Sequence, residues 1–178
     1  MSQSAPAPSL PVLVLNAQAD RRLKLGHLWI YSNEVDTARS PLKQFEMGQQ
    51  ALVTTNGGKP LGIALMNPTS LICGRIINRD ESHPLNKSLL VHRFKQALAL
   101  RELTFSEPYY RLVYGDSDLL PGLVVDRFGD YLVVQIAGAG MELVKNDIID
   151  ALVQVLKPEG ILLSNDHSAR ALENLPEY

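Results

Sequence analysis

The strongest constraint on the fold is a series of short apolar runs between residues 10 and 80, each bounded by turn-forming residues. The runs lie at 12–15, 51–55, 61–66 and 71–77. Asn56-Gly57-Gly58 and Asn67-Pro68 separate the later ones. Runs of this length between turn formers are typical of β-strands. The first half is therefore predicted to be a small β-barrel or sandwich, with a short helix at 18–25 that ends at Gly26.

The pattern changes at Pro84, where a helix is predicted over about 85–104. One face of this helix carries Leu90, Phe94, Ala97 and Leu98. Its charged residues are expected to point elsewhere, namely Lys87, Arg93 and Lys95. We expect this helix, within 81–107, to link two halves of the chain.

The second half, 108–178, is predicted to mix strands and a helix. Strands are expected at 109–115, 123–128 and 131–137, the last two joined in a hairpin at Gly129-Asp130. Apolar residues at spacings of three and four predict a helix over 141–156, and a buried strand follows at 161–164. The fold class is therefore α+β: a barrel, a linking helix and a small β-β-α-β domain. Residues 1–9, rich in Ser, Ala and Pro, are expected to form a flexible leader.

Composition limits the compartment and the partners. The 178 residues include one cysteine, Cys73, and carry a net charge of −2, and no apolar stretch has the length of a membrane span. These features favour the cytoplasm. A slightly acidic chain is not typical of an unaided, tight nucleic-acid binder. Residues 21–31, however, combine cationic and aromatic side chains with no acid; we call them the basic-aromatic segment.

Two stretches resemble a known family, the bacterial 23S rRNA cytosine-C5 methyltransferases. The first is Gly26-His27-Leu28-Trp29-Ile30-Tyr31-Ser32, with Leu28 where that family usually has proline, continued by residues 62–64 and 67–77. The second, more specific stretch comprises Gly115-Asp116-Ser117-Asp118, Leu120-Pro121-Gly122-Leu123 and Val125-Asp126-Arg127-Phe128-Gly129. Together they cover nearly all of the chain after residue 10.

The resemblance implies a PUA domain at 10–80 and a central domain at 108–178, incomplete at its C-terminus. It implies a part in rRNA processing, with S-adenosylmethionine as methyl donor of the full-length protein and large-subunit rRNA as partner. The chain ends at Tyr178, where the family would continue towards its catalytic domain. The resemblance implies that the chain is a fragment that binds RNA, binds no cofactor itself and does not methylate RNA.

The basic-aromatic segment is the first candidate for RNA contacts, because guanidinium groups bind phosphates and aromatic faces stack on unpaired bases. The candidate residues are Arg21, Arg22, Lys24, His27, Trp29 and Tyr31, extended by Arg75 and Arg79 near the end of the last barrel strand. Trp29 could equally be a core residue, since tryptophan is largely buried on average. The main alternative is a protein-interaction or dimerisation module, in which case the chain forms a homodimer.

Four further features are weighed against structural roles. Gly138-Ala139-Gly140 resembles a nucleotide-binding loop but lacks the third glycine, so a tight strand-to-helix turn explains it better. Ser117 with Asp166 and His167 suggests a small serine esterase, although the spacing departs from that pattern. Asp116, Asp118 and Asp126 are expected in turns rather than at a metal. Cys73, among apolar neighbours, is expected to be a small buried hydrophobe.

Overall fold

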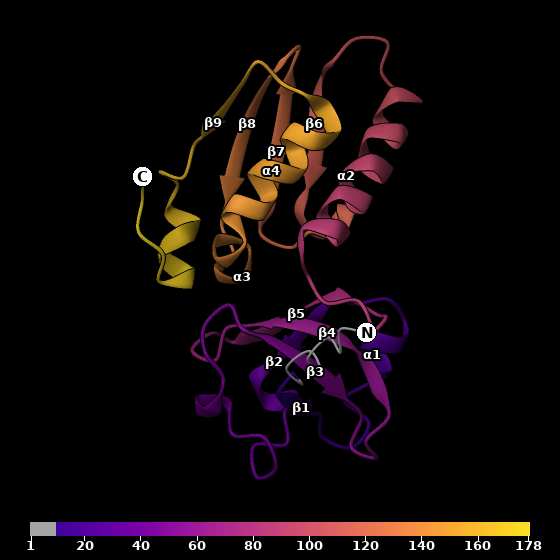
Figure 1. Cartoon of the computed structure of the whole chain (residues 1–178). Coiled ribbons are helices and arrows are strands. Elements are labelled where there is room, and N and C mark those ends of the chain that lie inside the picture. The colour runs from indigo at the N-terminus through magenta and orange to yellow at the C-terminus, as the bar shows by residue number, and fades with distance from the viewer. Residues whose placement is uncertain (1–9) are drawn as a thin grey trace, which may run out of the picture.

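A computed structural model describes residues 10–178, so the predicted flexible leader at 1–9 lies outside the described residues. The chain forms two halves stacked one on the other, joined by the segment that leads into helix α2 (Figure 1). None of the helices in residues 10–178 has the length and apolar character needed to cross a membrane.

The first half is a curled five-stranded sheet with strand order β1-β3-β4-β5-β2. The strands are β1 (Val12–Val14), β2 (Trp29–Tyr31), β3 (Gln50–Thr54), β4 (Pro60–Met66) and β5 (Ile72–Asn78). Short helical turns connect them: α1 (Arg21–Lys24), η1 (Ser32–Glu34) and η2 (Leu42–Gln44). The four predicted strands are confirmed, and the predicted helix at 18–25 is shortened to α1. Strand β2 was not predicted, because three residues are too few to show an alternating pattern.

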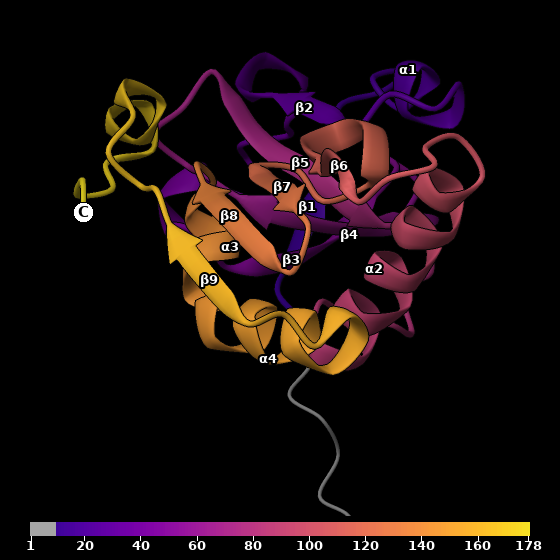
Figure 2. The same cartoon turned by 90° about the horizontal axis from the view of Figure 1, so that it is seen from above.

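The second half is a four-stranded sheet with strand order β6-β7-β8-β9. Its elements are α2 (Lys87–Glu102), β6 (Tyr109–Tyr114), η3 (Gly115–Asp118), β7 (Leu123–Phe128), β8 (Tyr131–Ile136), α3 (Ala139–Leu143), α4 (Lys145–Leu156), β9 (Gly160–Leu163) and η4 (Ser168–Glu173). The predicted hairpin is the antiparallel pair β7–β8, and β9 runs parallel to β8. Helices α2 and α4 pack together on one side of this sheet (Figure 2).

The three strands predicted in the second half are present before α3 and α4, although the β-β-α-β order names only two of them. Two other details of the second half differ from the predictions. The predicted helix 141–156 is two helices, because the backbone leaves helical geometry at Val144. Strand β9 is the edge strand and Leu162 is exposed, so the strand predicted at 161–164 is not buried.

Arg93 was predicted to point away from the core, and this was wrong. Its side chain is buried and donates hydrogen bonds to the carbonyl oxygens of Ile77, at 2.7 Å, and Leu119. Burial lowers the pKa of Arg93. The guanidinium therefore ties α2 to the end of β5 and to the loop after η3.

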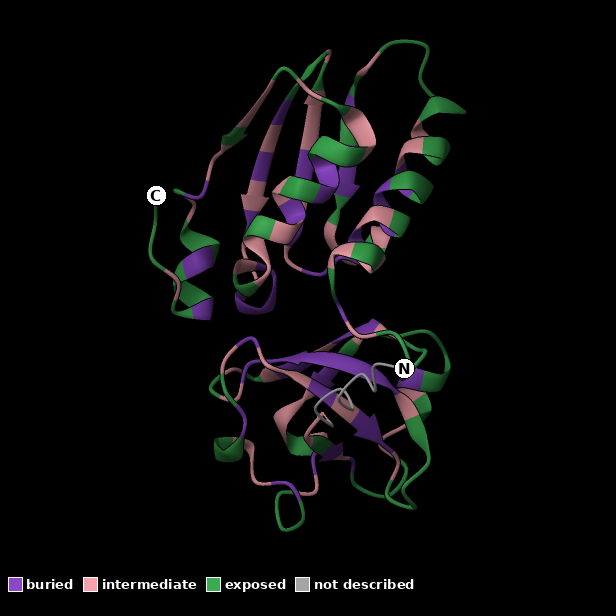
Figure 3. Cartoon of the chain, viewed as in Figure 1, coloured by how far each residue is buried: buried purple, intermediate pink, exposed green. Residues whose placement is uncertain are grey.

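The larger apolar core belongs to both halves. Ile63, Leu65 and Ile77 of the first sheet join the cluster that contains Leu90 and Phe94 of α2 and the inner residues of β6–β8. Figure 3 shows buried residues on the strands of both sheets. A second, smaller cluster fills the barrel around Leu13, Ile30, Val53 and Cys73. Because the two halves share a core, their relative orientation is fixed.

Candidate nucleic-acid interface

The basic-aromatic segment runs through α1, the loop after it and β2, at the side of the first half. Arg21, Lys24 and His27 are exposed, whereas Arg22 and Tyr31 are half-buried. A cavity of about 390 Å³ is lined by Arg22, His27, Leu28, Trp29, Tyr31 and Asp116. The fold thus gathers four of the eight predicted RNA-binding residues around one hollow, together with an acid that the sequence did not place there.

Glu34 organises this segment. Its carboxylate accepts hydrogen bonds from Nη2 of Arg22 at 2.8 and 2.9 Å and from the backbone N–H of Tyr31 at 2.9 Å. The guanidinium of Arg22 also lies 4.9 Å from the centre of the Tyr31 ring. Arg22 is therefore largely neutralised, and it fixes the orientation of the ring.

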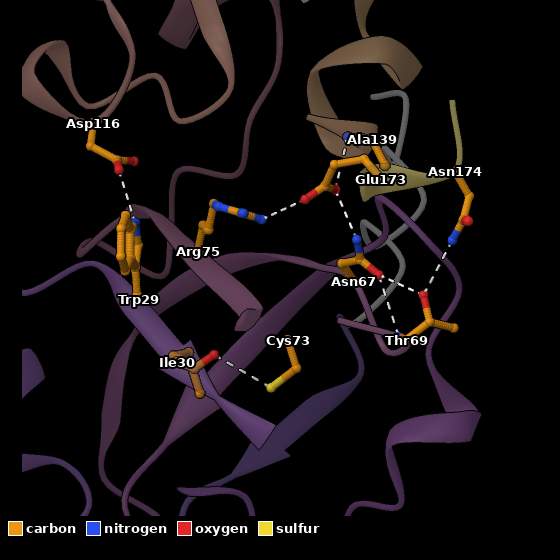
Figure 4. Close-up of polar contacts among 10 residues, drawn as sticks. All are labelled: Trp29, Ile30, Asn67, Thr69, Cys73, Arg75, Asp116, Ala139, Glu173 and Asn174. Carbon is orange, nitrogen blue, oxygen red and sulfur yellow. Dashed lines mark hydrogen bonds and ion pairs between the residues drawn. The ribbon is translucent and has the colours of Figure 1, made fainter. Parts of the chain in front are cut away.

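Trp29 is neither a core residue nor a free one. Its side chain is 40% exposed, and its indole N–H donates to Oδ2 of Asp116 at 2.8 Å, as Figure 4 shows. Asp116 belongs to η3 of the second half. The indole therefore bridges the two halves while much of its surface stays accessible.

Arg75 faces the second half and not the solvent side of the barrel. Its Nη1 donates to Oε1 of Glu173 at 2.9 Å, and Asn67 donates to the other oxygen of the same carboxylate at 2.9 Å. The backbone N–H of Ala139 approaches that second oxygen at 3.4 Å. Figure 4 shows Glu173 between these groups of both halves. Glu173 was not predicted, because no local pattern in the sequence connects it with Asn67 and Arg75, which lie about a hundred positions away.

The remaining candidate cations differ in whether their charge is paired with a carboxylate. Lys24 forms an ion pair with Asp20, and this hydrogen bond holds the pKa of the Asp20 carboxyl below its usual range. Arg79 donates to the carbonyl oxygen of His27 at 3.1 Å, which places its exposed guanidinium beside the segment. Within residues 10–178, no carboxylate forms an ion pair with Arg21 or Arg79. These two arginines carry the least compensated charge of the candidate surface.

The glycine loop at 138–140 is packed closely against neighbouring elements. A Cβ atom at Gly140 would lie 2.8 Å from the side chain of Leu65, and one at Gly138 would lie 3.4 Å from Gly122. The loop begins α3 and packs tightly on β4 and on the turn before β7. The predicted strand-to-helix turn is confirmed, and close packing explains its glycines.

The esterase and metal interpretations gain no geometric support. Ser117 and His167 line the same cavity, yet no hydrogen bond joins them in the described part of the chain, and Asp166 accepts from Ser164 instead. Among residues 10–178 no cluster of His, Cys, Asp and Glu could hold a metal ion. Asp118 accepts from the backbone N–H of Tyr114 at 2.7 Å, as expected for turn chemistry.

Cys73 is the small buried hydrophobe that the sequence predicts. It lies within the barrel core, and burial raises the pKa of its thiol to about 11. A thiol of this kind is almost fully protonated at neutral pH and is a poor nucleophile.

The first half of the chain matches a known class of domain. Residues 13–79 match the family of PUA-like domains, so the first half is a PUA-like domain.

Over a longer stretch, the chain is similar to proteins named ribosomal RNA large subunit methyltransferase I. The relative from Aliivibrio fischeri is 32% identical over 161 residues, which cover 89% of this chain and 40% of the relative. The relative from Tolumonas auensis is 32% identical over 166 residues, 92% of this chain and 41% of the relative. The chain thus spans about two fifths of the length of these relatives and is homologous to their N-terminal part.

Solved structures agree on the fold. The protein SMU.776, described as a methyltransferase and crystallised in complex with SAH, superposes with a TM-score of 0.72. It is 19% identical in sequence, and the match covers 86% of this chain and 40% of that one. A likeness at this identity concerns the fold alone, and it extends over both halves of the chain.

Proposed function

We propose that this chain is the RNA-binding and substrate-positioning part of an S-adenosylmethionine-dependent 23S rRNA (cytosine-C5) methyltransferase. The observation that carries the proposal is the cavity at the basic-aromatic segment of a PUA-like domain, lined by Arg22, His27, Trp29 and Tyr31. The similarity to large-subunit rRNA methyltransferases supports large-subunit rRNA as the partner.

The structure suggests different tasks for the eight candidate residues. Arg21, Lys24, His27 and Arg79 are exposed and would contact phosphates. Trp29 and Tyr31 would stack on unpaired bases. Arg22 and Arg75 are already engaged by carboxylates, so we assign them the positioning of the surface. With few uncompensated cations and a net charge of −2, the binding should be modest and strongly dependent on salt.

Under this proposal methyl transfer takes place in a part of the parent protein beyond these residues. Close packing explains the glycine loop of the described chain, and Cys73 is buried. The task of the present residues is to bind the RNA and to present it in one orientation.

The test is a titration of this chain with a 23S rRNA fragment across a series of salt concentrations. The variant Arg21→Ala/Lys24→Ala/Arg79→Ala removes exposed charge while leaving the Arg22–Glu34 contact intact. Each lost phosphate contact should reduce the slope of log affinity against log salt by about 0.7 for single-stranded RNA, so the triple variant should lose about two units.

The matched control removes three exposed lysines outside the segment, Lys43, Lys59 and Lys95, by substitution with alanine. If both variants change the slope equally, the RNA does not bind at the basic-aromatic segment. If no binding occurs at low salt and the chain self-associates independently of salt, it is instead a dimerisation module, and the proposal is wrong.

A further inference from the structure

A second cavity lies beside the first, in the second half of the chain. It has a volume of about 470 Å³ and lies where η3, the start of β7, the end of β8 and the segment leading into η4 meet. Tyr114, Asp116, Ser117, Gln135 and His167 provide its aromatic and polar walls. Its volume is within the range of small-ligand sites. Asp116 lines both cavities, so a chain passing the basic-aromatic segment would reach this one next.

Two residues that line this cavity each have a polar side-chain atom without a partner among the described residues. Oδ1 of Asp116 and Nε2 of His167 are buried, and neither forms a hydrogen bond with any group in residues 10–178. The other carboxylate oxygen of Asp116 is held by the indole N–H of Trp29 at 2.8 Å. Buried polar atoms without partners are uncommon because they lose their hydration without compensation. Asp116 and His167 both line the cavity, so a ligand there could supply these atoms with a partner.

Tyr114 supplies a stacking surface at the same place. Its side chain is 57% exposed, and the guanidinium of Arg111 lies 5.0 Å from the centre of its ring. Arg111 is in turn fixed by two hydrogen bonds to Asp126, at 2.8 and 3.0 Å. A ring held in this way can accept a planar ligand without first losing much conformational freedom.

We propose that this cavity binds one unpaired nucleobase that carries an exocyclic amino group. The base stacks on Tyr114, its amino group donates to the Asp116 carboxylate, and its ring edge bonds His167 or Gln135. A carboxylate accepts from the amino group of cytosine and is mismatched with the O4 carbonyl of uracil, since both are acceptors. The inference rests on the proposed RNA-binding function and adds a base preference to it.

The test compares binding of fluorescently labelled oligo(C) and oligo(U) RNA of equal length at low salt. These ligands differ at the base edge in two places: cytosine has an amino group at position 4 and an acceptor at N3, whereas uracil has a carbonyl oxygen at position 4 and an N3–H donor. We expect oligo(C) to bind about tenfold more tightly, the size of one good base-edge contact. Tyr114→Leu should weaken both ligands about tenfold. Tyr109→Leu, an exposed tyrosine of the same strand that does not line the cavity, should change neither.

Asp116→Asn is the decisive variant. An asparagine can keep an oxygen towards the Trp29 indole and present an amide N–H₂ to the cavity, so the preference should shift towards oligo(U). Unchanged Trp29 emission and an unchanged melting temperature would verify that the contact between the halves is kept. A shift of preference with the fold intact supports the subsite.

The outcomes separate this inference from the proposed function. Equal affinity for oligo(C) and oligo(U), with binding still dependent on Arg21 and Arg79, overturns the base subsite and leaves RNA binding in place. An unchanged preference in Asp116→Asn overturns it as well. Absence of binding to either RNA at low salt overturns RNA binding by this chain, and the subsite with it.

Discussion

Glu173 should be the most sensitive single position in the contact between the halves. It is 7% exposed, and its carboxylate accepts hydrogen bonds from Asn67 and Arg75 at 2.9 Å each. Glu173→Ala would leave Asn67, itself 2% exposed, and the Arg75 guanidinium without their acceptor. Removing one partner of a fully buried pair costs about 3–5 kcal/mol. Since the Arg75 side chain is 25% exposed and water can reach it, we expect about 3 kcal/mol.

For a chain of this size each kcal/mol lowers the melting temperature by about 2–4 °C, so Glu173→Ala should melt about 6–12 °C lower. Urea unfolding should be followed by circular dichroism and by the emission of Trp29, the single tryptophan of the chain. Asp150→Ala is the control, because it breaks the exposed pair with Lys87 and should cost less than about 0.5 kcal/mol. Equal losses of stability in the two variants would refute the role of Glu173 as a buried contact between the halves.

Three further predictions concern single positions. Gly140→Val should destabilise the chain by about 1–3 kcal/mol in thermal melting, because a Cβ there would meet Leu65 at 2.8 Å; Gly57→Ala, with 3.9 Å to its nearest neighbour, should be close to neutral. Cys73 should react with a thiol reagent at pH 8 only after addition of urea, because burial raises its pKa to about 11; rapid labelling of the native chain would contradict this. The Ser82 hydroxyl chiefly lowers the pKa of Asp80 to about 2. Ionised Asp80 therefore contributes stability above a pH of about 4, and this contribution is lost as the pH falls towards 2. An NMR titration of the Asp80 carboxyl with a midpoint near 4 would refute the assignment.

Most of the elements could be predicted from the sequence, because their signals are local. The apolar runs of β3, β4 and β5 and the turn formers between them mark strands directly. Strand β2 was not predicted, because its position depends on pairing with β5, which lies about forty residues away. The burial of Arg93 was not predicted, because helix periodicity assigns charged residues to the exposed face. Its burial is stabilised by carbonyl groups of other elements.

The candidate site was predictable in its components but not in its arrangement. The cations and aromatic residues of 21–31 are visible in the sequence, and four of the eight candidates do line one cavity. Their neutralising partners are not visible: Glu34 follows the segment, and Glu173 lies near the end of the chain. A sequence shows which charges exist, but the fold decides which of them are compensated.

The core shared by both halves bears on how this protein can be dissected. Ile63, Leu65 and Ile77 belong to the PUA-like half in sequence, yet they are buried in one cluster with Leu90 and Phe94 of α2. A chain cut near residue 80 would expose these three side chains to solvent as an apolar patch that promotes aggregation. The PUA-like half is therefore not a detachable module here, and experiments on an excised barrel would report on aggregation more than on RNA.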